Sequence, residues 1–321
     1  MNDNPGPGPD AGCDSAICTL FEGDYHLGLA ALVNSLVRAG YTGSIWAGYR
    51  GPLPPWVHRL QRLDSEPPAF RVAGQVRLVF LPLETKLHFT HLKPQFMLDL
   101  LAGPAHDCRY LWYFDPDICL RSSWPYFRQW QNYGTALCEE INSYHLAARD
   151  PLRCRWMEIG KQMGLGEPRP LTGYFNAGMV GVPRAHLQLL HLWKRIIGYA
   201  GETGSDLKML MPGIRELPFH AVDQDALNMA LMYVDHPLST MGPEGMGFLP
   251  GEVGVYHTVG HKPWRGSILR RALAALPPSP AIKFFFTQVS SPIRAYPPWR
   301  LRALKLECSL AALIGRFYRR R

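Results

Sequence analysis

The chain has 321 residues and a mass of 36.2 kDa, which suits one large domain or one domain with an appendage. Its residues are 47% apolar and include nine tryptophans, so a chain that is disordered throughout is excluded. The formal charge of +8 is unevenly distributed, because residues 265–321 hold twelve Lys or Arg side chains and one acid, Glu307. The remainder is mildly acidic, so a polyanionic partner is expected only at the C-terminal segment.

The N-terminus and the cysteines bear on cellular location. Residues 1–13 are polar and rich in Gly and Pro, without the regions of a signal peptide, and are expected to form a disordered leader. Seven scattered cysteines without a C-x-x-C pair argue against a disulfide framework or a thiolate zinc site. They favour a reducing, cytoplasmic location. No apolar run approaches the ~18–20 residues that cross a bilayer.

Apolar runs and helical periodicity alternate along the first half of the chain. Strands are expected at 15–21, 44–49, 76–81 and 110–114, and helices at 28–38 and around 94–101. This alternation predicts a mostly parallel α/β sheet, in which ligands bind beyond the carboxyl ends of the strands. The second half adds strands at 134–138 and 174–182 and an amphipathic helix at 223–233.

Two acids follow the most apolar strand. Asp115 and Asp117 come directly after the run YLWYF at 110–114. Carboxylates at i and i+2, released from a buried strand into a turn, can converge on one Mg²⁺ or Mn²⁺, which prefers oxygen ligands and completes its shell with substrate phosphates. Acidic pairs also occur in ordinary turns, but ionised acids beside a buried strand need a partner.

Two further motifs carry polar side chains suited to a sugar. Asn176 is followed by the small residues Ala177 and Gly178, which would let the backbone approach a ligand; the alternative is a strand preceded by a turn. At 223–225, Asp-Gln-Asp begins a predicted helix. Asp223 is expected to be its N-cap, with Leu227 and Leu231 on the buried face. Capping would explain one acid, but not three consecutive polar residues.

The last motif is His257-Thr-Val-Gly260-His-Lys262. An imidazole can supply a third metal ligand, Gly260 permits close approach of a phosphate, and Lys262 can neutralise a departing diphosphate. The alternative interpretation of this segment is simply a loop.

Together and in this order, the motifs resemble glycosyltransferase family 8, the glycogenin and lipooligosaccharide galactosyltransferase type of GT-A enzyme. The resemblance covers about residues 15–264. It implies a GT-A fold, a catalytic domain at 14–266 and a separate basic amphipathic tail at 267–321. One departure is that a single residue, His261, separates Gly260 from Lys262, whereas the family usually has two.

The resemblance also implies roles for individual residues. Thr19, Asp24 and Tyr25 would border the base and ribose of the donor, and Lys93, which heads the helix before the acidic strand, would contact it. The expected metal ligands are Asp115, Asp117 and His257, and the expected contacts to the donor sugar are Asn176 and Ala177. Asp223 and Gln224 would lie beside the anomeric carbon, and Gly260 with Lys262 would form the diphosphate loop.

The implied reaction moves a hexose from a nucleotide-diphosphate sugar, UDP-glucose or UDP-galactose, to a glycan or lipid-linked acceptor with Mn²⁺ or Mg²⁺. Family resemblance, not residue chemistry, implies retention of anomeric configuration. Gln224 is not expected to be a covalent nucleophile, because an amide is a poor one. Asp225 would serve the acceptor or only the start of its helix.

Residues 267–321 lie outside the resemblance. Trp299, Ala303, Leu306, Leu310, Leu313 and Phe317 follow helical spacing, with basic residues off that face. Two interpretations stay open: a helix lying on anionic lipid at the inner face of the membrane, or a terminal helix packed on the catalytic domain. Nucleic-acid binding is not expected, since no motif for it accompanies the charge.

Two other functions compete with glycosyl transfer. A metal-dependent phosphohydrolase also places D-x-D after an apolar strand, with Asp115 as nucleophile. That motif normally lies near the chain start and is followed by Thr or Val where this chain has Cys119. The second alternative is a sugar-nucleotide-binding domain without turnover.

Overall fold

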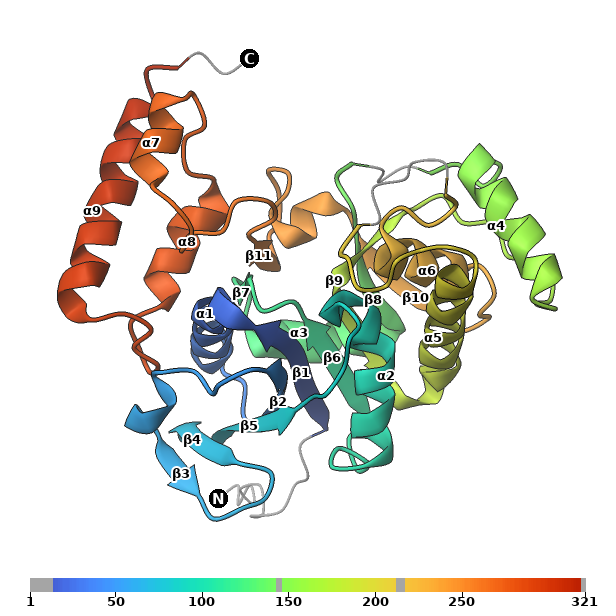
Figure 1. Cartoon of the computed structure of the whole chain (residues 1–321), viewed down its shortest axis with the longest axis horizontal. Coiled ribbons are helices and arrows are strands. Elements are labelled where there is room, and N and C mark those ends of the chain that lie inside the picture. Colours follow the sequence, from blue (N-terminus) through green and yellow to red (C-terminus); the bar gives the residue numbers. More distant parts are fainter. Residues whose placement is uncertain (1–13, 143–145, 212–216, 319–321) are drawn as a thin grey trace, which may run out of the picture.

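The computed structural model describes residues 14–142, 146–211 and 217–318, so the predicted leader at 1–13 lies outside the described residues. A nine-stranded sheet forms the centre, in the order β10-β8-β9-β6-β1-β2-β5-β4-β3 (Figure 1). Its strands, in chain order, are β1 (Ser15–Glu22), β2 (Ser44–Arg50), β3 (Gln61–Leu63), β4 (Ala69–Ala73), β5 (Val76–Pro82), β6 (Tyr110–Phe114), β8 (Thr135–Glu139), β9 (Phe175–Pro183) and β10 (Leu238–Met241). A second small sheet pairs β7 (Ile118–Leu120) with β11 (Val255–His257).

The central sheet is mostly parallel, as the alternation of strands and helices predicted. Seven of the nine strands run in one direction, and only β4 and β9 oppose them. β9 lies between β6 and β8 and is antiparallel to both. This reversal brings the 175–183 segment alongside the strand that leads into the two acids.

Helices cover both faces of the sheet, which explains why its inner strand β6 is apolar throughout. Successive residues of a strand point to opposite faces. In β6, Leu111 and Tyr113 belong to the core on one face, and Trp112 and Phe114 to the core on the other. The helices are α1 (His26–Arg38), α2 (Phe89–Ala102), α3 (Trp124–Trp130), α4 (Pro151–Gln162), α5 (Leu187–Glu202), α6 (Val222–Leu231), α7 (Ile268–Leu273), α8 (Pro280–Gln288) and α9 (Pro298–Ile314).

Two predicted helix starts are wrong. α2 begins at Phe89, so Lys93 lies inside the helix instead of heading it, and Pro94 is an interior proline. The nitrogen Nδ1 of His88 accepts the backbone N–H of Thr90 and caps this earlier start. A proline favours the first turn of a helix, and that preference gave the misleading signal.

α6 begins at Val222 with Ala221 in the N-cap position, so Asp223 is not the cap. Asp225 satisfies the first backbone donors instead, as its Oδ2 accepts the N–H groups of His220 and Ala221 at 2.8 and 2.9 Å. Leu227 and Leu231 are fully buried, as the spacing predicted.

The C-terminal helices form a layer beside α1 that is fixed by one buried side chain. Nδ2 of Asn34 donates to the carbonyls of Gln288 and Ile293 at 2.6 and 2.8 Å, and its Oδ1 accepts the N–H of Ile293 at 2.7 Å. α8 contacts α1, and α9 lies at the outer edge of the molecule against α7 and α8 (Figure 1). Within the described residues, Cys18, Cys119, Cys138, Cys154 and Cys308 are free thiols, and no helix is long and apolar enough to span a membrane.

Candidate active site

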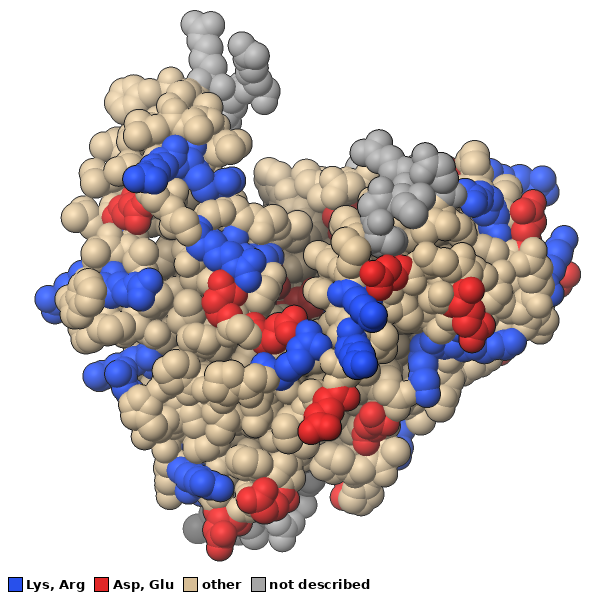
Figure 2. Space-filling view, viewed as in Figure 1, with Lys and Arg blue, Asp and Glu red and all other residues tan. Residues whose placement is uncertain are grey.

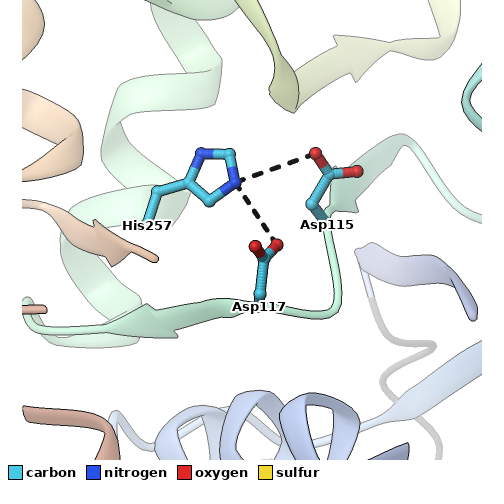
Figure 3. A group of neighbouring side chains, drawn as sticks. All are labelled: Asp115, Asp117 and His257. Atoms are coloured by element: carbon cyan, nitrogen blue, oxygen red, sulfur yellow. Dashed lines mark ion pairs between the residues drawn. The ribbon is translucent and has the colours of Figure 1, made fainter. Parts of the chain in front are cut away.

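The two acids after β6 meet a histidine from far along the chain. Asp115 and Asp117 lie where the chain leaves β6 for β7, and β11 pairs with β7 so that His257 stands opposite Ile118. Nε2 of His257 is 3.3 Å from Oδ1 of Asp117 and 3.9 Å from Oδ2 of Asp115. The three side chains point toward one another, with ligand atoms all within 4.8 Å (Figure 3).

This donor set fits a hard divalent cation. Two carboxylates and one imidazole can hold a divalent cation, and the three come from a turn and a strand held by the small sheet. Nδ1 of His257 is buried and has no hydrogen-bond partner among the described residues. The ring is held by packing, with Phe248 5.9 Å away between centroids, and Nε2 faces the acids.

Gly178 forms the wall of this cluster, a role that the sequence did not reveal. Its carbonyl accepts the N–H of Asp115 at 2.7 Å, which ties β9 to the end of β6. A Cβ at Gly178 would lie 2.7 Å from Oδ2 of Asp115 and 2.8 Å from Cε1 of His257. Any larger residue would therefore intrude on the space that the ligand atoms enclose.

A buried lysine links the acids to the start of α6. Nζ of Lys93 lies 3.1 Å from both Oδ1 of Asp115 and Oδ2 of Asp223, and donates to the carbonyl of Ala177 at 3.0 Å. The lysine is 2% exposed. Burial alone would lower its pKa, but Asp115 and Asp223 outweigh burial, so the pKa of Lys93 is raised and the ammonium stays charged.

A second lysine, Lys262, forms an ion pair with Asp117. Nζ of Lys262 donates to Oδ2 of Asp117 and, at 2.8 Å, to the carbonyl of Thr258. Burial raises the pKa of Asp117, but His257 and Lys262 overcome that effect and hold the pKa well below its usual range. Gly260, which lies between Thr258 and Lys262 in the sequence, has a φ of +76°, in the left-handed region that glycine adopts readily. The segment from 258 to 262 is therefore a turn that folds its lysine back onto the acid.

The Asn176 motif lies beside this cluster and is held by side chains from three segments. Asn176 is 6% exposed, its Nδ2 donates to Oε2 of Glu140, and its Oδ1 accepts the N–H of Gly178 at 2.7 Å. Oε1 of Gln224 accepts the N–H of Ala177 at 3.1 Å. The side chains of Asn176, Asp223 and Gln224 and the backbone of Ala177 are thus brought together around β9 and α6. Glu140 was not anticipated by the sequence.

Both carboxylate oxygens of Asp225 accept hydrogen bonds from the protein itself. Its Oδ1 accepts the hydroxyl of Tyr174 at 2.6 Å, and its Oδ2 accepts the two N–H groups at the start of α6. Burial raises the pKa of Asp225 to about 6, although these hydrogen bonds oppose the rise. Two roles were expected for Asp225, contact with the acceptor or support of the helix start, and these hydrogen bonds are those of a residue that supports the helix start.

The residues expected around the nucleotide divide into buried and exposed positions. Thr19 lies inside β1 with no exposed surface, and its Oγ1 has no hydrogen-bond partner among the described residues. Asp24 is partly exposed and accepts two hydrogen bonds from Arg265, at 2.5 and 2.6 Å. Tyr25 packs edge-on against Trp264 at 5.5 Å, with the Arg265 guanidinium 5.0 Å from its ring. Tyr25 also lies 5.8 Å from Nζ of Lys262, which connects this aromatic and basic group to the metal cluster.

The surface of the molecule is hollowed between the α7–α9 part and the part formed by α4, α5 and α6 (Figure 2). Both acidic and basic side chains gather at the rim of this hollow. Mixed charge of this kind suits a ligand that carries phosphates and is bound through a cation.

Comparison with known proteins supports the fold. The sequence matches no protein-family profile and no curated protein. Many solved structures match, and one of them is described as a WbbM bifunctional glycosyltransferase in its apo form. It superposes with a TM-score of 0.52 at 13% identity over 96% of this chain, and the chain spans 53% of the length of that protein.

The protein therefore has a glycosyltransferase fold of the GT-A-like type, a large mostly parallel sheet flanked by helices. At the carboxyl end of strand β6 it carries a candidate Asp-Asp-His metal centre.

Proposed function

We propose that this protein transfers a hexose from a nucleotide-diphosphate sugar to an acceptor in a metal-dependent reaction. The observation that carries the proposal is the convergence of Asp115, Asp117 and His257 at the end of β6, in a chain with a glycosyltransferase fold. Ligands of open α/β sheets bind at such strand ends. The bound cation would neutralise the donor's diphosphate and stabilise it as it departs.

The charges around the cluster suit this task. Three carboxylates, Asp115, Asp117 and Asp223, face two ammonium groups, Lys93 and Lys262. A divalent cation would change the formal balance from −1 to +1, which a diphosphate could match. Lys262 would then exchange Asp117 for a phosphate oxygen, since a cation on Asp117 competes with its ammonium. Preorganised charges of this kind stabilise the negative charge that develops on a leaving group.

The sugar would lie over β9 and the start of α6. Gln224 holds the N–H of Ala177, and Lys93 holds the carbonyl of Ala177 and the carboxylate of Asp223. We propose that Asn176, Ala177, Asp223 and Gln224 orient the donor sugar. We also propose retention of configuration, as the family resemblance implies. Because an amide is a poor nucleophile, a retaining reaction would proceed by attack of the acceptor on the face from which the diphosphate leaves.

For the donor we propose UDP-glucose or UDP-galactose with Mn²⁺ or Mg²⁺, with Asp24 and Tyr25 bordering the nucleotide; Thr19, which has no exposed surface, would lie behind them. The acceptor would be a glycan or a lipid-linked glycan. A catalytic unit at 14–266 would contain all of these residues. A reducing compartment such as the cytoplasm would suit a chain with free thiols at Cys18, Cys119, Cys138, Cys154 and Cys308.

Release of UDP tests the proposal directly. We expect UDP release from UDP-glucose or UDP-galactose in the presence of Mn²⁺, and a loss of at least about 100-fold for Asp117→Asn. Asp64→Asn, at an exposed acid far from the cluster, should behave as wild type. A raised melting temperature with the donor and Mn²⁺ would report binding apart from turnover.

Each alternative function has its own outcome in this assay. A domain that binds but does not turn over would show the thermal shift without UDP release. A phosphohydrolase would release phosphate from simple phosphate esters and would ignore the sugar. Absence of both a shift and release with any nucleotide sugar would contradict the proposal.

A further inference from the structure

Helix α9 has two apolar faces, and only one of them is covered by protein. Cys308 and Ala311 are buried in the core that α9 shares with α7 and α8, and Leu301 and Leu304 pack against it. The other face is exposed. Its large apolar side chains are each between 44% and 72% exposed, and they are Trp299, Leu306, Leu310 and Leu313; Phe317, which is 83% exposed, follows just after the helix.

The four side chains on α9 form one line, which together with Phe317 is here called the α9 stripe. At 100° per residue the four fall within an arc of roughly 60° on a helix, and Trp299 and Leu313 are about 21 Å apart along it. α9 lies at the outer edge of the molecule, with α7 and α8 between it and the sheet (Figure 1). The stripe is therefore a long apolar surface without a partner among the described residues.

Positive charge borders the stripe. Arg300, Arg302, Lys305 and Arg316 are all exposed. The one acid after residue 265, Glu307, is turned toward α7, where its Oε1 accepts the Ser267 hydroxyl at 2.5 Å and the N–H of Leu269 at 3.0 Å. On the α7–α9 part of the face in Figure 2, blue patches of Lys and Arg cover more of the surface than the red of Asp and Glu.

We propose that the α9 stripe docks on the surface of an anionic phospholipid bilayer. The apolar side chains would enter the boundary between headgroups and acyl chains, and the basic side chains would contact lipid phosphates. A second copy of the chain fits less well, because pairing two stripes would oppose their basic borders. This proposal uses no residue of the candidate active site, so it stands or falls separately from the proposed function.

Vesicle flotation of the full chain tests the docking surface. We expect binding to vesicles of phosphatidylcholine with phosphatidylglycerol, and little binding to phosphatidylcholine alone. Leu306→Gln/Leu310→Gln and, separately, Arg302→Gln/Lys305→Gln should each weaken binding by about tenfold or more. The matched controls are Leu249→Gln, an exposed leucine elsewhere, and Lys161→Gln/Lys194→Gln on α4 and α5; both should bind as wild type.

Unchanged melting temperatures would show that the variants fold, and Trp299→Gln/Phe317→Gln tests the same surface if Leu306→Gln/Leu310→Gln is unstable. Absence of binding to anionic vesicles at low salt would overturn the proposal. It would also fail if the controls lost as much affinity as the stripe variants. A dimer in light scattering that Leu306→Gln/Leu310→Gln dissociates, without vesicle binding, would assign the stripe to a second copy of the chain.

Discussion

Two lysines are folded into a cluster of acids, and this is the central feature of the site at the scale of single residues. Lys93 is almost wholly buried between Asp115 and Asp223, and Lys262 holds Asp117. A buried ion pair gains little overall, but removing one partner leaves an uncompensated charge in a low-dielectric interior. The negative charges of the aspartates are therefore compensated only while each lysine ammonium, or a metal cation in its place, remains beside them.

Lys93→Met should destabilise the protein strongly. We expect a loss of about 3–5 kcal/mol in the free energy of unfolding, because Asp115 and Asp223 would face each other without their shared cation. Mn²⁺ should raise the melting temperature of this variant more than that of wild type. Chemical denaturation with and without Mn²⁺ measures both effects. Arg62→Met, which breaks an exposed pair with Glu66, should cost no more than about 1 kcal/mol. Equal losses in the two variants would contradict the importance of burial.

Gly178→Ala should impair the metal centre while leaving the fold intact. The added Cβ would crowd Oδ2 of Asp115 and Cε1 of His257, so we expect the affinity for Mn²⁺ to fall about tenfold, within the cost typical of overpacking. A titration of Mn²⁺ followed by thermal shift gives the affinity. Gly198→Ala is the control, since a Cβ there meets nothing within 4 Å. An unchanged Mn²⁺ affinity in Gly178→Ala would argue against the proposed ligand set.

At the scale of elements, a stacked histidine pair fastens the far edge of the sheet. The rings of His186 and His236 lie 3.9 Å apart, and both are within hydrogen-bond distance of the Thr135 hydroxyl on β8. Burial is the main cause that lowers the pKa of His236 to about 4, and the neighbouring His186 adds to it. This edge, where β8 pairs with β10, thus depends on neutral imidazoles.

The pair predicts a loss of stability in acid. A histidine with a lowered folded pKa stabilises the protein fully above its unfolded pKa of about 6.5, and that contribution is lost as the pH falls toward the folded value. Because His236 is only half-buried, we expect about 1–2 kcal/mol between pH 7 and 4.5. His236→Gln should lose less stability over this range than wild type, as measured by denaturation at both pH values.

The wild type must be compared with a variant, because Asp225 changes the free energy of unfolding with pH in the opposite direction to His236. The raised pKa of Asp225 favours the folded state at low pH, and this contribution is lost as the pH rises through about 6. The difference between His236→Gln and wild type removes that shared background. The exposed His58→Gln should follow wild type. If His236→Gln and wild type lose equal stability, the histidine pair is not the cause.

At the scale of the whole molecule, the C-terminal helices are joined to the sheet domain through α1. Ala31 on α1 and Cys119 on β7 share a core with Phe285 and Phe286 of α8. The three hydrogen bonds of Asn34 fix the segment after α8 to the same helix. Because β7 also holds β11, this layer supports the strand that carries His257.

Asn34→Ala should loosen this junction. Loss of its bonds leaves the carbonyls of Gln288 and Ile293 and one N–H unsatisfied, so we expect about 3 kcal/mol of destabilisation. Hydrogen exchange should become faster at 280–293 and stay slow in β6. Asn132→Ala, at an exposed asparagine bonded to Tyr110, is the control. Uniformly faster exchange across all strands would show that the junction is not a local element.

Much of the fold was predictable from local pattern. The runs at 15–21, 44–49, 76–81 and 110–114 all form strands of the central sheet, because β-branched and aromatic runs bounded by turns carry a strong local signal. The helix starts at Phe89 and Val222 were missed, since a histidine cap and an aspartate four residues into a helix leave no simple pattern.

The candidate site divides in the same way. By itself, the sequence placed Asp115 and Asp117 at the end of a buried strand, because an unbroken apolar run followed by acids has few other solutions. Only the tertiary structure decided that β9 runs antiparallel beside β6, bringing Gly178 against Asp115, and that β11 pairs with β7 to bring His257 there. It also decided that Lys93 and Lys262 pair with these acids and that the α9 stripe faces outward. Strand pairing, burial and ion pairing depend on contacts between segments that are distant in the sequence. The periodicity of the sequence indicates only which face of an element is apolar and does not indicate what packs against that face.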